Sequence, residues 1–266
     1  MVGDAPSGLR AGVIAFTGLM LLFLLAPLVV VMAASVSAGG YLVFPPQGLS
    51  LRWYEAIFAD RRYIEAAWTS LRVAVATTVI AVPIGTAAAI GLSQPGGRWR
   101  GAYELLFLSP LLLPTILLAI GLMIVAANVF GGSSVVWLVI GHVVLALPYV
   151  VRTVGAVIQG IDPATEEAAR VMGARWWQRL TLVTLPQCKS GIFAGAFLAF
   201  LVSFDDAVLI LFLRTPTIDT VPLRIYASLE FSPDPGVAAA STCLILIAAV
   251  TVLATERLLG GRRVVG

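Results

Sequence analysis

Six long apolar runs, separated by short polar stretches, dominate the pattern of hydrophobic and polar positions along the chain. They cover residues 11–35, 66–92, 103–127, 134–158, 190–213 and 237–259. A helix needs about 20 apolar residues to cross the hydrocarbon core of a bilayer, and backbone amides in lipid must find partners within their own segment. The pattern therefore predicts six membrane-spanning helices. The alternation over about ten residues that is typical of membrane β-barrels is not found in the sequence.

The first run has two interpretations. The small residues of VMAASVSAGG, which starts at Val31, resemble a signal-peptide cleavage site downstream of the basic Arg10. The apolar core of a signal peptide has about 7–15 residues, whereas the run from Ala11 to Ala34 is much longer. We therefore expect this helix to be retained.

The composition agrees with an integral membrane protein. Hydrophobic residues make up 59% of the 266 positions, charged residues make up 12%, and the mean hydropathy is +0.98. A soluble domain carries about 25% charged residues, so this chain cannot cover a water-facing surface. One all-α transmembrane domain over residues 1–266 accounts for the pattern.

The basic residues predict the orientation, because arginine and lysine are enriched in cytoplasmic loops. With the N-terminus inside, eleven of the 17 lie on the inner side: Arg10, Arg98, Arg100, Arg152, Arg170, Arg175, Arg179, Lys189, Arg257, Arg262 and Arg263. Six lie on the outer side: Arg52, Arg61, Arg62, Arg72, Arg214 and Arg224. Both termini are therefore expected in the cytoplasm. The net charge of +3 then reflects membrane topology rather than a nucleic-acid partner.

The inner segment 159–189 is unusually long and polar for this chain. Asp162 followed by Pro163 predicts a helix start, with an N-cap and a proline in the first turn. Glu166 and Arg170 are spaced for an i,i+4 ion pair. Gly173 can adopt the left-handed conformation that ends a helix. The first half of the segment is thus predicted to be a short helix.

A second short helix is predicted after this glycine. Trp176, Leu180 and Val183 are spaced to share one face, and Pro186 ends the run. In the first helix, Ala164 and Ala168 form part of a small-residue face beside acidic side chains. Small side chains allow the backbone of another protein to approach closely. The segment is either such a docking surface or a pair of surface helices that cover the inner end of the bundle.

The segment resembles the EAA loop of ATP-binding-cassette (ABC) importer permeases. That motif is Glu-Ala-Ala, three residues, Gly, nine residues, an aliphatic residue, one residue, then Leu-Pro. The matching positions, with the neighbouring Glu166 included, are Glu166, Glu167, Ala168, Ala169, Gly173, Val183, Leu185 and Pro186. Valine stands where isoleucine is usual, which is a mild departure.

The resemblance implies a six-helix permease subunit, and residues 159–189 would be its coupling loop. In that family the loop docks into a separate cytoplasmic ATPase and transmits its closure to the pore. The implied partners are a paralogous permease subunit, two ATP-binding subunits, and a periplasmic or lipid-anchored solute-binding protein. The implied location is the bacterial inner membrane.

The chain has no nucleotide-binding motif of its own. A P-loop needs a lysine directly after glycine, and the only lysine, Lys189, follows Cys188. We therefore expect no catalysis and no cofactor in this chain, with ATP and magnesium held by the partner ATPases. We find no spacing of metal ligands either.

Two adjacent acids, Asp205 and Asp206, interrupt the fifth apolar run in FLVSFDDAVLILFL. An intramembrane carboxylate is costly, so a functional role is the default hypothesis, and a cationic solute fits two negative charges. The alternative is a structural role, through an ion pair with Arg72 or hydrogen bonds to helix ends. An aspartyl protease is disfavoured, because adjacent residues of one helix point about 100° apart.

Several stretches resemble the second permease subunit of spermidine/putrescine importers. They are SLRWYEAIF, SFDDAVLILFL and VPLRIYASLEFSPDPGVAAAST, within a similarity from about Leu51 to Leu259. The resemblance implies a polyamine solute, to which Tyr226 and Glu230 of the expected outer loop would add cation–π and charge contacts. Related permeases carry aminophosphonates, iron(III) or thiamine. A channel is the hypothesis from another class.

Two other features have structural interpretations. His142 lies among apolar residues and is expected to be packed and hydrogen-bonded rather than part of a proton relay. The GIFAG stretch, Gly191 to Gly195, is a GxxxG pattern that permits close contact between helices.

Overall fold

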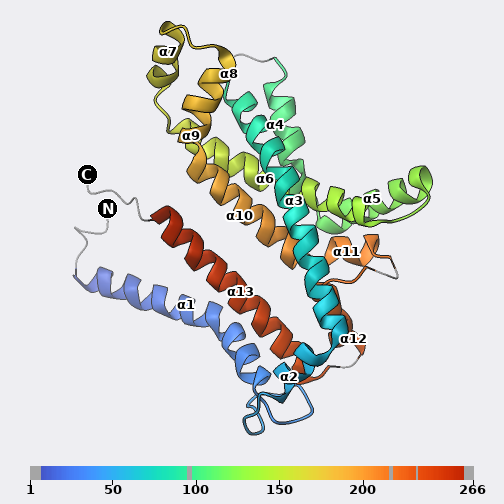
Figure 1. Cartoon of the computed structure of the whole chain (residues 1–266). Coiled ribbons are helices and arrows are strands. Elements are labelled where there is room, and N and C mark those ends of the chain that lie inside the picture. The colour runs from blue at the N-terminus through green and yellow to red at the C-terminus, as the bar shows by residue number, and fades with distance from the viewer. Residues whose placement is uncertain (1–6, 95–97, 216–217, 232, 261–266) are drawn as a thin grey trace. The chain divides into compact units, whose positions relative to one another are not determined.

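The computed structural model describes residues 7–94, 98–215, 218–231 and 233–260 (Figure 1). Apart from one isolated bridge between Ser37 and Leu49, all regular structure in these ranges is helical. The elements are α1 (Ser7–Ser35), α2 (Arg52–Ala59), α3 (Arg61–Ser93), α4 (Arg100–Leu108), the 3-10 turn η1 (Ser109–Leu111), α5 (Thr115–Phe130), α6 (Val135–Gln159), α7 (Pro163–Val171), α8 (Trp176–Arg179), the π turn η2 (Leu180–Thr184), α9 (Leu185–Gln187), α10 (Lys189–Asp205), α11 (Val208–Leu213), α12 (Val221–Phe231) and α13 (Pro235–Gly260).

Four helices among the described residues are long and apolar enough to cross a membrane, and there are six spans if each of two bent pairs counts as one. The four lie in α1, α3, α6 and α13. The bent pairs are Arg100–Leu111 with Thr115–Val129, at 100°, and Trp176–Gln187 with Lys189–Asp205, at 69°. This agrees with six apolar segments, but not all of them are single straight helices.

Two expected continuous helices are broken. The helix expected over 103–127 stops near Pro110 and restarts at Thr115, after Pro114, whose backbone nitrogen carries no hydrogen to donate. The helix expected over 190–213 ends at Asp205 and restarts at Val208. The backbone of Asp206 is extended there, with φ −72° and ψ 122°. The outer loop expected between the fifth and sixth spans also contains a helix, α12.

The described structure divides into two compact units. The first unit comprises Met1–Arg61 and Ile225–Leu246, and the second comprises Arg62–Arg224 and Ile247–Gly266. In the first unit, the described residues of α1 from Gly8 to Val30 are all exposed. The short helix α2 follows α1 in this unit, and the Tyr54 hydroxyl lies 2.7 Å from Ser35 Oγ at the end of α1.

The second unit is organised around α6, which contacts α3 and α10 through glycines. A Cβ atom on Gly85 of α3 would lie 2.7 Å from Val150 Cβ of α6. A Cβ atom on Gly191 of α10 would lie 2.8 Å from the carbonyl oxygen of Thr153, and one on Gly195 would lie 2.7 Å from Thr153 Oγ1. The close helix contact predicted from the GxxxG pattern is therefore formed, with α6 as the neighbour.

Candidate functional site

The local structure predicted for α7 is formed. The Ala164 N–H donates a 2.9 Å hydrogen bond to Asp162 Oδ1, and Pro163 occupies the first turn. Gly173 has φ +81° and ends the helix. Its N–H donates to Arg170 O, and the Ala174 N–H donates to Ala169 O, both at 3.0 Å. This is the Schellman arrangement, which satisfies the last carbonyls of a helix and requires a left-handed residue.

The N-cap supports a first prediction. Asp162→Ala should lower the free energy of opening of α7 by about 1 kcal/mol, because it removes the acceptor for an orphan N–H. Amide hydrogen exchange over 163–171 in the full-length chain measures this change. Thr165→Ala, an exposed position in the same turn, is the matched control. Equal exchange in the two variants would contradict the capping role.

The ion pairs of this segment differ from the prediction. Glu166 does not pair with Arg170; it lies 3.6 Å from Nε of Arg179 in α8. Arg170 instead contacts Glu167 at 3.0 Å. Arg179 is partly buried and also donates from Nη1 to the Ala174 carbonyl at 3.2 Å. The sequence rule considered only neighbours on one helix, whereas Arg179 reaches back across the glycine turn and ties the two short helices together.

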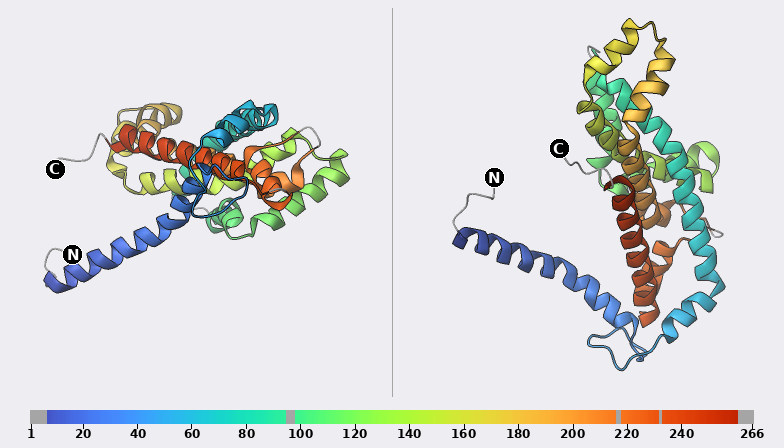
Figure 2. Two further views of the ribbon diagram at one scale, coloured as in Figure 1. Left: turned by 90° about the horizontal axis from the view of Figure 1, so that it is seen from below. Right: turned by 60° about the vertical axis from the view of Figure 1, so that its left-hand side comes forward.

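The motif residues of α7 point in two directions. Ala169 is buried, while Glu167 and Ala168 are exposed, as are Val171 and Met172 at about 80% each. The right-hand view of Figure 2 shows α7 and α8 at one end of the second unit. The turn thus presents acidic, small and apolar side chains together on a free surface.

The face predicted for the second short helix is wrong in one position. Residues Leu180–Thr184 form a π turn, in which the Leu185 N–H donates to the Leu180 carbonyl. Hydrogen bonding from i to i+5 places residues five apart above one another. Leu185, rather than Val183, therefore shares a face with Trp176 and Leu180.

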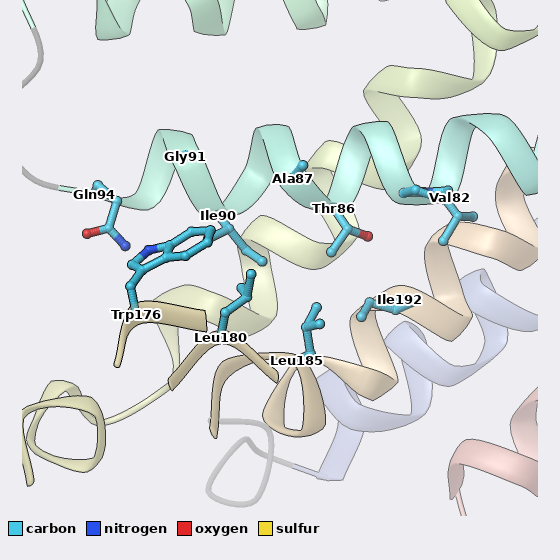
Figure 3. A pocket seen from close by; sticks show the side chains of 11 residues that line it. Val82, Thr86, Ala87, Ile90, Gly91, Gln94, Trp176, Leu180, Leu185 and Ile192 are labelled. Carbon is cyan, nitrogen blue, oxygen red and sulfur yellow. The ribbon is translucent and has the colours of Figure 1, made fainter. Parts of the chain in front are cut away.

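That face lines an apolar cavity of about 600 Å³ in the second unit. In Figure 3, Trp176, Leu180 and Leu185 point toward α3, where Thr86 and Ile90 lie opposite. The remaining lining residues are Val82, Pro83, Ala87, Gly91, Gln94 and Ile192. The segment 176–185 therefore packs beside one end of the membrane helix α3. We expect a displacement of this segment to displace α3 as well.

The adjacent aspartates have different surroundings. Asp205 is exposed at the end of α10 and has no hydrogen-bond or ion-pair partner within the described part of the chain. The Asp206 side chain is 11% exposed, and its Oδ1 accepts a 2.7 Å hydrogen bond from Leu209 N–H in the first turn of α11. The alternative of hydrogen bonding to a helix end is thus observed for Asp206. The alternative of an ion pair with Arg72 is not formed among the described residues.

His142 is the residue near this site that sequence reasoning did not connect to it. It is buried, as expected, and its Nδ1 bonds to the Leu138 carbonyl at 2.7 Å. Its Nε2 lies 4.0 Å from Asp206 Oδ1. A lone histidine in an apolar helix was the available signal, but nothing in the sequence shows which carboxylate it faces.

Tyr226 and Glu230 are exposed on α12, in the first unit. Asp205 and Asp206 belong to the second unit. The four candidate solute contacts therefore do not form a common site within either unit. Among the described residues, no group of three or more His, Cys, Asp or Glu side chains is placed to hold a metal ion.

A set of apolar spans with a motif-bearing loop exposed between two of them is the arrangement expected of a membrane-transport permease. The sequence profile of binding-protein-dependent transport system inner membrane components matches residues 81–263, and the chain belongs to that family. It is thus a multi-pass membrane protein and a permease subunit of an ABC importer. Its family is one of transport proteins rather than of enzymes.

Named relatives cover most of the chain. The spermidine/putrescine transport system permease protein PotC of Escherichia coli K12 is 30% identical over 211 residues, covering 79% of this chain and 80% of that protein. The putrescine transport system permease protein PotI of the same strain is 29% identical, covering 84% and 82%. PotC of Haemophilus influenzae is 28% identical, covering 91% and 94%.

Solved structures share the fold. A chain of a bacterial ABC transporter involved in the import of the acidic polysaccharide alginate superposes with a TM-score of 0.75 at 18% identity, covering 96% of both chains. A chain of the MetNI methionine ABC transporter gives 0.63 at 18% identity, covering 74% of this chain and 94% of that chain. These similarities support the importer-permease architecture and say nothing about the solute.

Proposed function

We propose that this permease carries polyamines of the spermidine and putrescine type. The observation that carries the proposal is the similarity to PotC and PotI over about four fifths of the chain. The exposed carboxylate of Asp205 at the break between α10 and α11 supports it, because an acid that has no partner among the described residues and lies at a discontinuous helix suits an ammonium group. Tyr226 and Glu230 are proposed as further contacts from α12.

Other solutes and another mechanism are separable by uptake measurements. The solutes of related permeases, namely aminophosphonates, iron(III) and thiamine, should not compete for uptake if the solute is a polyamine. A channel would pass solute without its ATPase, whereas a coupled permease would pass none. If the wild-type complex takes up neither spermidine nor putrescine, the solute assignment is wrong.

We propose that closure of the ATPase is transmitted to this chain through the coupling loop, residues 159–189. The exposed surface of α7 and its glycine turn is suited to a groove on a cytoplasmic ATPase, with Glu167 available to basic groups there. The π turn and Leu185 would pass its movement to α3 across the cavity. Val183 and Pro186 belong to the same stretch.

The complete machine then needs other subunits. We propose a paralogous permease as the second half of the pathway, two ATPase subunits that bind ATP and magnesium, and a periplasmic or lipid-anchored binding protein. The excess of inner arginine and lysine supports cytoplasmic termini in a bacterial inner membrane. This chain would itself hold no cofactor.

Asp205→Asn tests the solute contact. Removing one charge from a charge-assisted contact costs about 1.5–3 kcal/mol, so the KM for spermidine uptake by the complete transporter should rise about tenfold or more. Glu104→Gln, an exposed acid-to-amide change on α4, is the matched control and should leave the KM unchanged. An unchanged KM in Asp205→Asn would remove this carboxylate from the solute path.

A further inference from the structure

The break in the fifth apolar run is held by Asp206. The backbone leaves the helical conformation at this residue, and α11 restarts two residues later. Asp206 Oδ1 accepts the Leu209 N–H, which has no carbonyl partner within so early a turn. Leu209, Ile210 and Leu213 of α11 are fully buried. Asp206 therefore fixes the start of a short helix that is packed into the core.

His142 meets this carboxylate at the point where α11 packs on α6. The neighbouring Gly141 lies in this contact, since a Cβ atom there would lie 3.3 Å from a Leu213 methyl carbon and 3.4 Å from one of Leu209. His142 is 2% exposed, and its Nε2 is 4.0 Å from Asp206 Oδ1. The ring is buried, and the Asp206 carboxylate is the acidic group that its second nitrogen faces.

The hydrogen bond at Nδ1 determines which ring nitrogen of His142 carries the hydrogen in the neutral imidazole. A carbonyl oxygen only accepts, so Nδ1 carries the hydrogen in its 2.7 Å bond to Leu138 O. In a neutral ring, Nε2 then presents a lone pair to the carboxyl group. The pair is attractive when one proton lies between them, on the ring or on the acid. Each group therefore orients the other.

We propose that His142 is a positioning residue for transport. It holds Asp206, and thereby the break before α11, so that Asp205 alone keeps a carboxylate available to the solute. Asp206 thus has a structural role, whereas Asp205 faces the transport pathway. The last step rests on the proposed function, because it takes the solute to be a cation.

Three substitutions of His142 test the positioning role in the complete transporter. A glutamine amide nitrogen falls near the place of Nε2, whereas an asparagine amide falls near Nδ1. We expect H142L to lower the maximal uptake rate about tenfold, the factor for 1.4 kcal/mol, with little change in KM. H142Q should restore the rate to within about threefold of wild type, the factor for roughly 0.65 kcal/mol, and H142N should not. D206A should lower the rate at least as much as H142L, because it also removes the acceptor for Leu209 N–H. The double variant should be no worse than D206A, as expected if His142 acts through Asp206.

A second readout does not depend on the solute. In a chain with Cys188 and Cys243 replaced by alanine, D205C should react with a charged, membrane-impermeant thiol reagent in the absence of solute. Adding H142L, which leaves the Asp206 carboxylate in place but removes the ring that faces it, should change the D205C labelling rate severalfold, since the break is then no longer fixed.

The inference is overturned if H142Q and H142N behave alike, whether both transport or neither does. It is also overturned if H142L leaves both the maximal uptake rate and the D205C labelling rate unchanged. If only the polyamine assignment is wrong, wild-type uptake of spermidine is absent, while H142L still changes the D205C labelling rate.

Discussion

Glu167→Arg will uncouple this permease from its ATPase, lowering ATP-driven uptake by more than about tenfold. Glu167 lies on the exposed surface of α7, and within the described part of the chain it pairs with Arg170, at 3.0 Å on the same helix. Reversing its charge places two arginines side by side and opposes any basic groove on the ATPase. Removing one partner of a charge pair that is buried and hydrogen-bonded in an interface costs about 2–5 kcal/mol. Uptake into vesicles that contain the complete transporter measures the loss.

Glu167→Gln is the matched control for this variant. It keeps an acceptor for Arg170 and adds no repulsion, so it should retain most of the uptake. Copurification of the ATPase distinguishes lost docking from lost insertion, since the chain itself should still reach the membrane. Full transport by a normally inserted Glu167→Arg variant, with its ATPase bound, would show that α7 is not the docking element.

Gly191→Leu should prevent stable folding of the second unit. Even a Cβ atom on this residue would lie 2.8 Å from the Thr153 carbonyl oxygen and 3.0 Å from Val154 Cα, both of them backbone atoms of α6. Inserting methylenes into a packed core costs about 1–3 kcal/mol or more, and a backbone cannot rotate away as a side chain can. We expect a large fall in thermal stability of the detergent-solubilised chain, or no folded protein.

Gly155→Ala on α6 is the control for that substitution. A Cβ atom there would meet no atom within 4 Å. Alanine is favoured over glycine in a helix by about 0.5–1 kcal/mol, so the stability should be unchanged or slightly higher. A Gly191→Leu chain as stable as wild type would mean that α10 does not pack closely on α6.

Features with local causes were predictable from the sequence. The capping of α7 by Asp162 and its end at Gly173 depend on one or two side chains and on the freedom of glycine to adopt positive φ. The apolar runs reflect the thickness of a bilayer. The contact made by Gly191 and Gly195 follows from their spacing, although the partner helix did not.

Features with tertiary causes were not predictable. Hydropathy does not distinguish a straight span from one that bends by 100°, as happens after Leu111. The partner of Glu166 is Arg179 because the glycine turn folds the second helix back. His142 and Asp206 face each other because α11 packs against α6. No local sequence pattern predicts that packing.

The π turn at Leu180–Thr184 has a consequence for the length of this stretch. A π turn contains more residues than a turn of an ordinary α-helix. Leu185 is therefore aligned with Trp176 and Leu180. Deleting one residue would rotate everything downstream by about 100° about the helix axis. Side-chain replacements in this stretch should thus be tolerated far better than any insertion or deletion between Gly173 and Pro186.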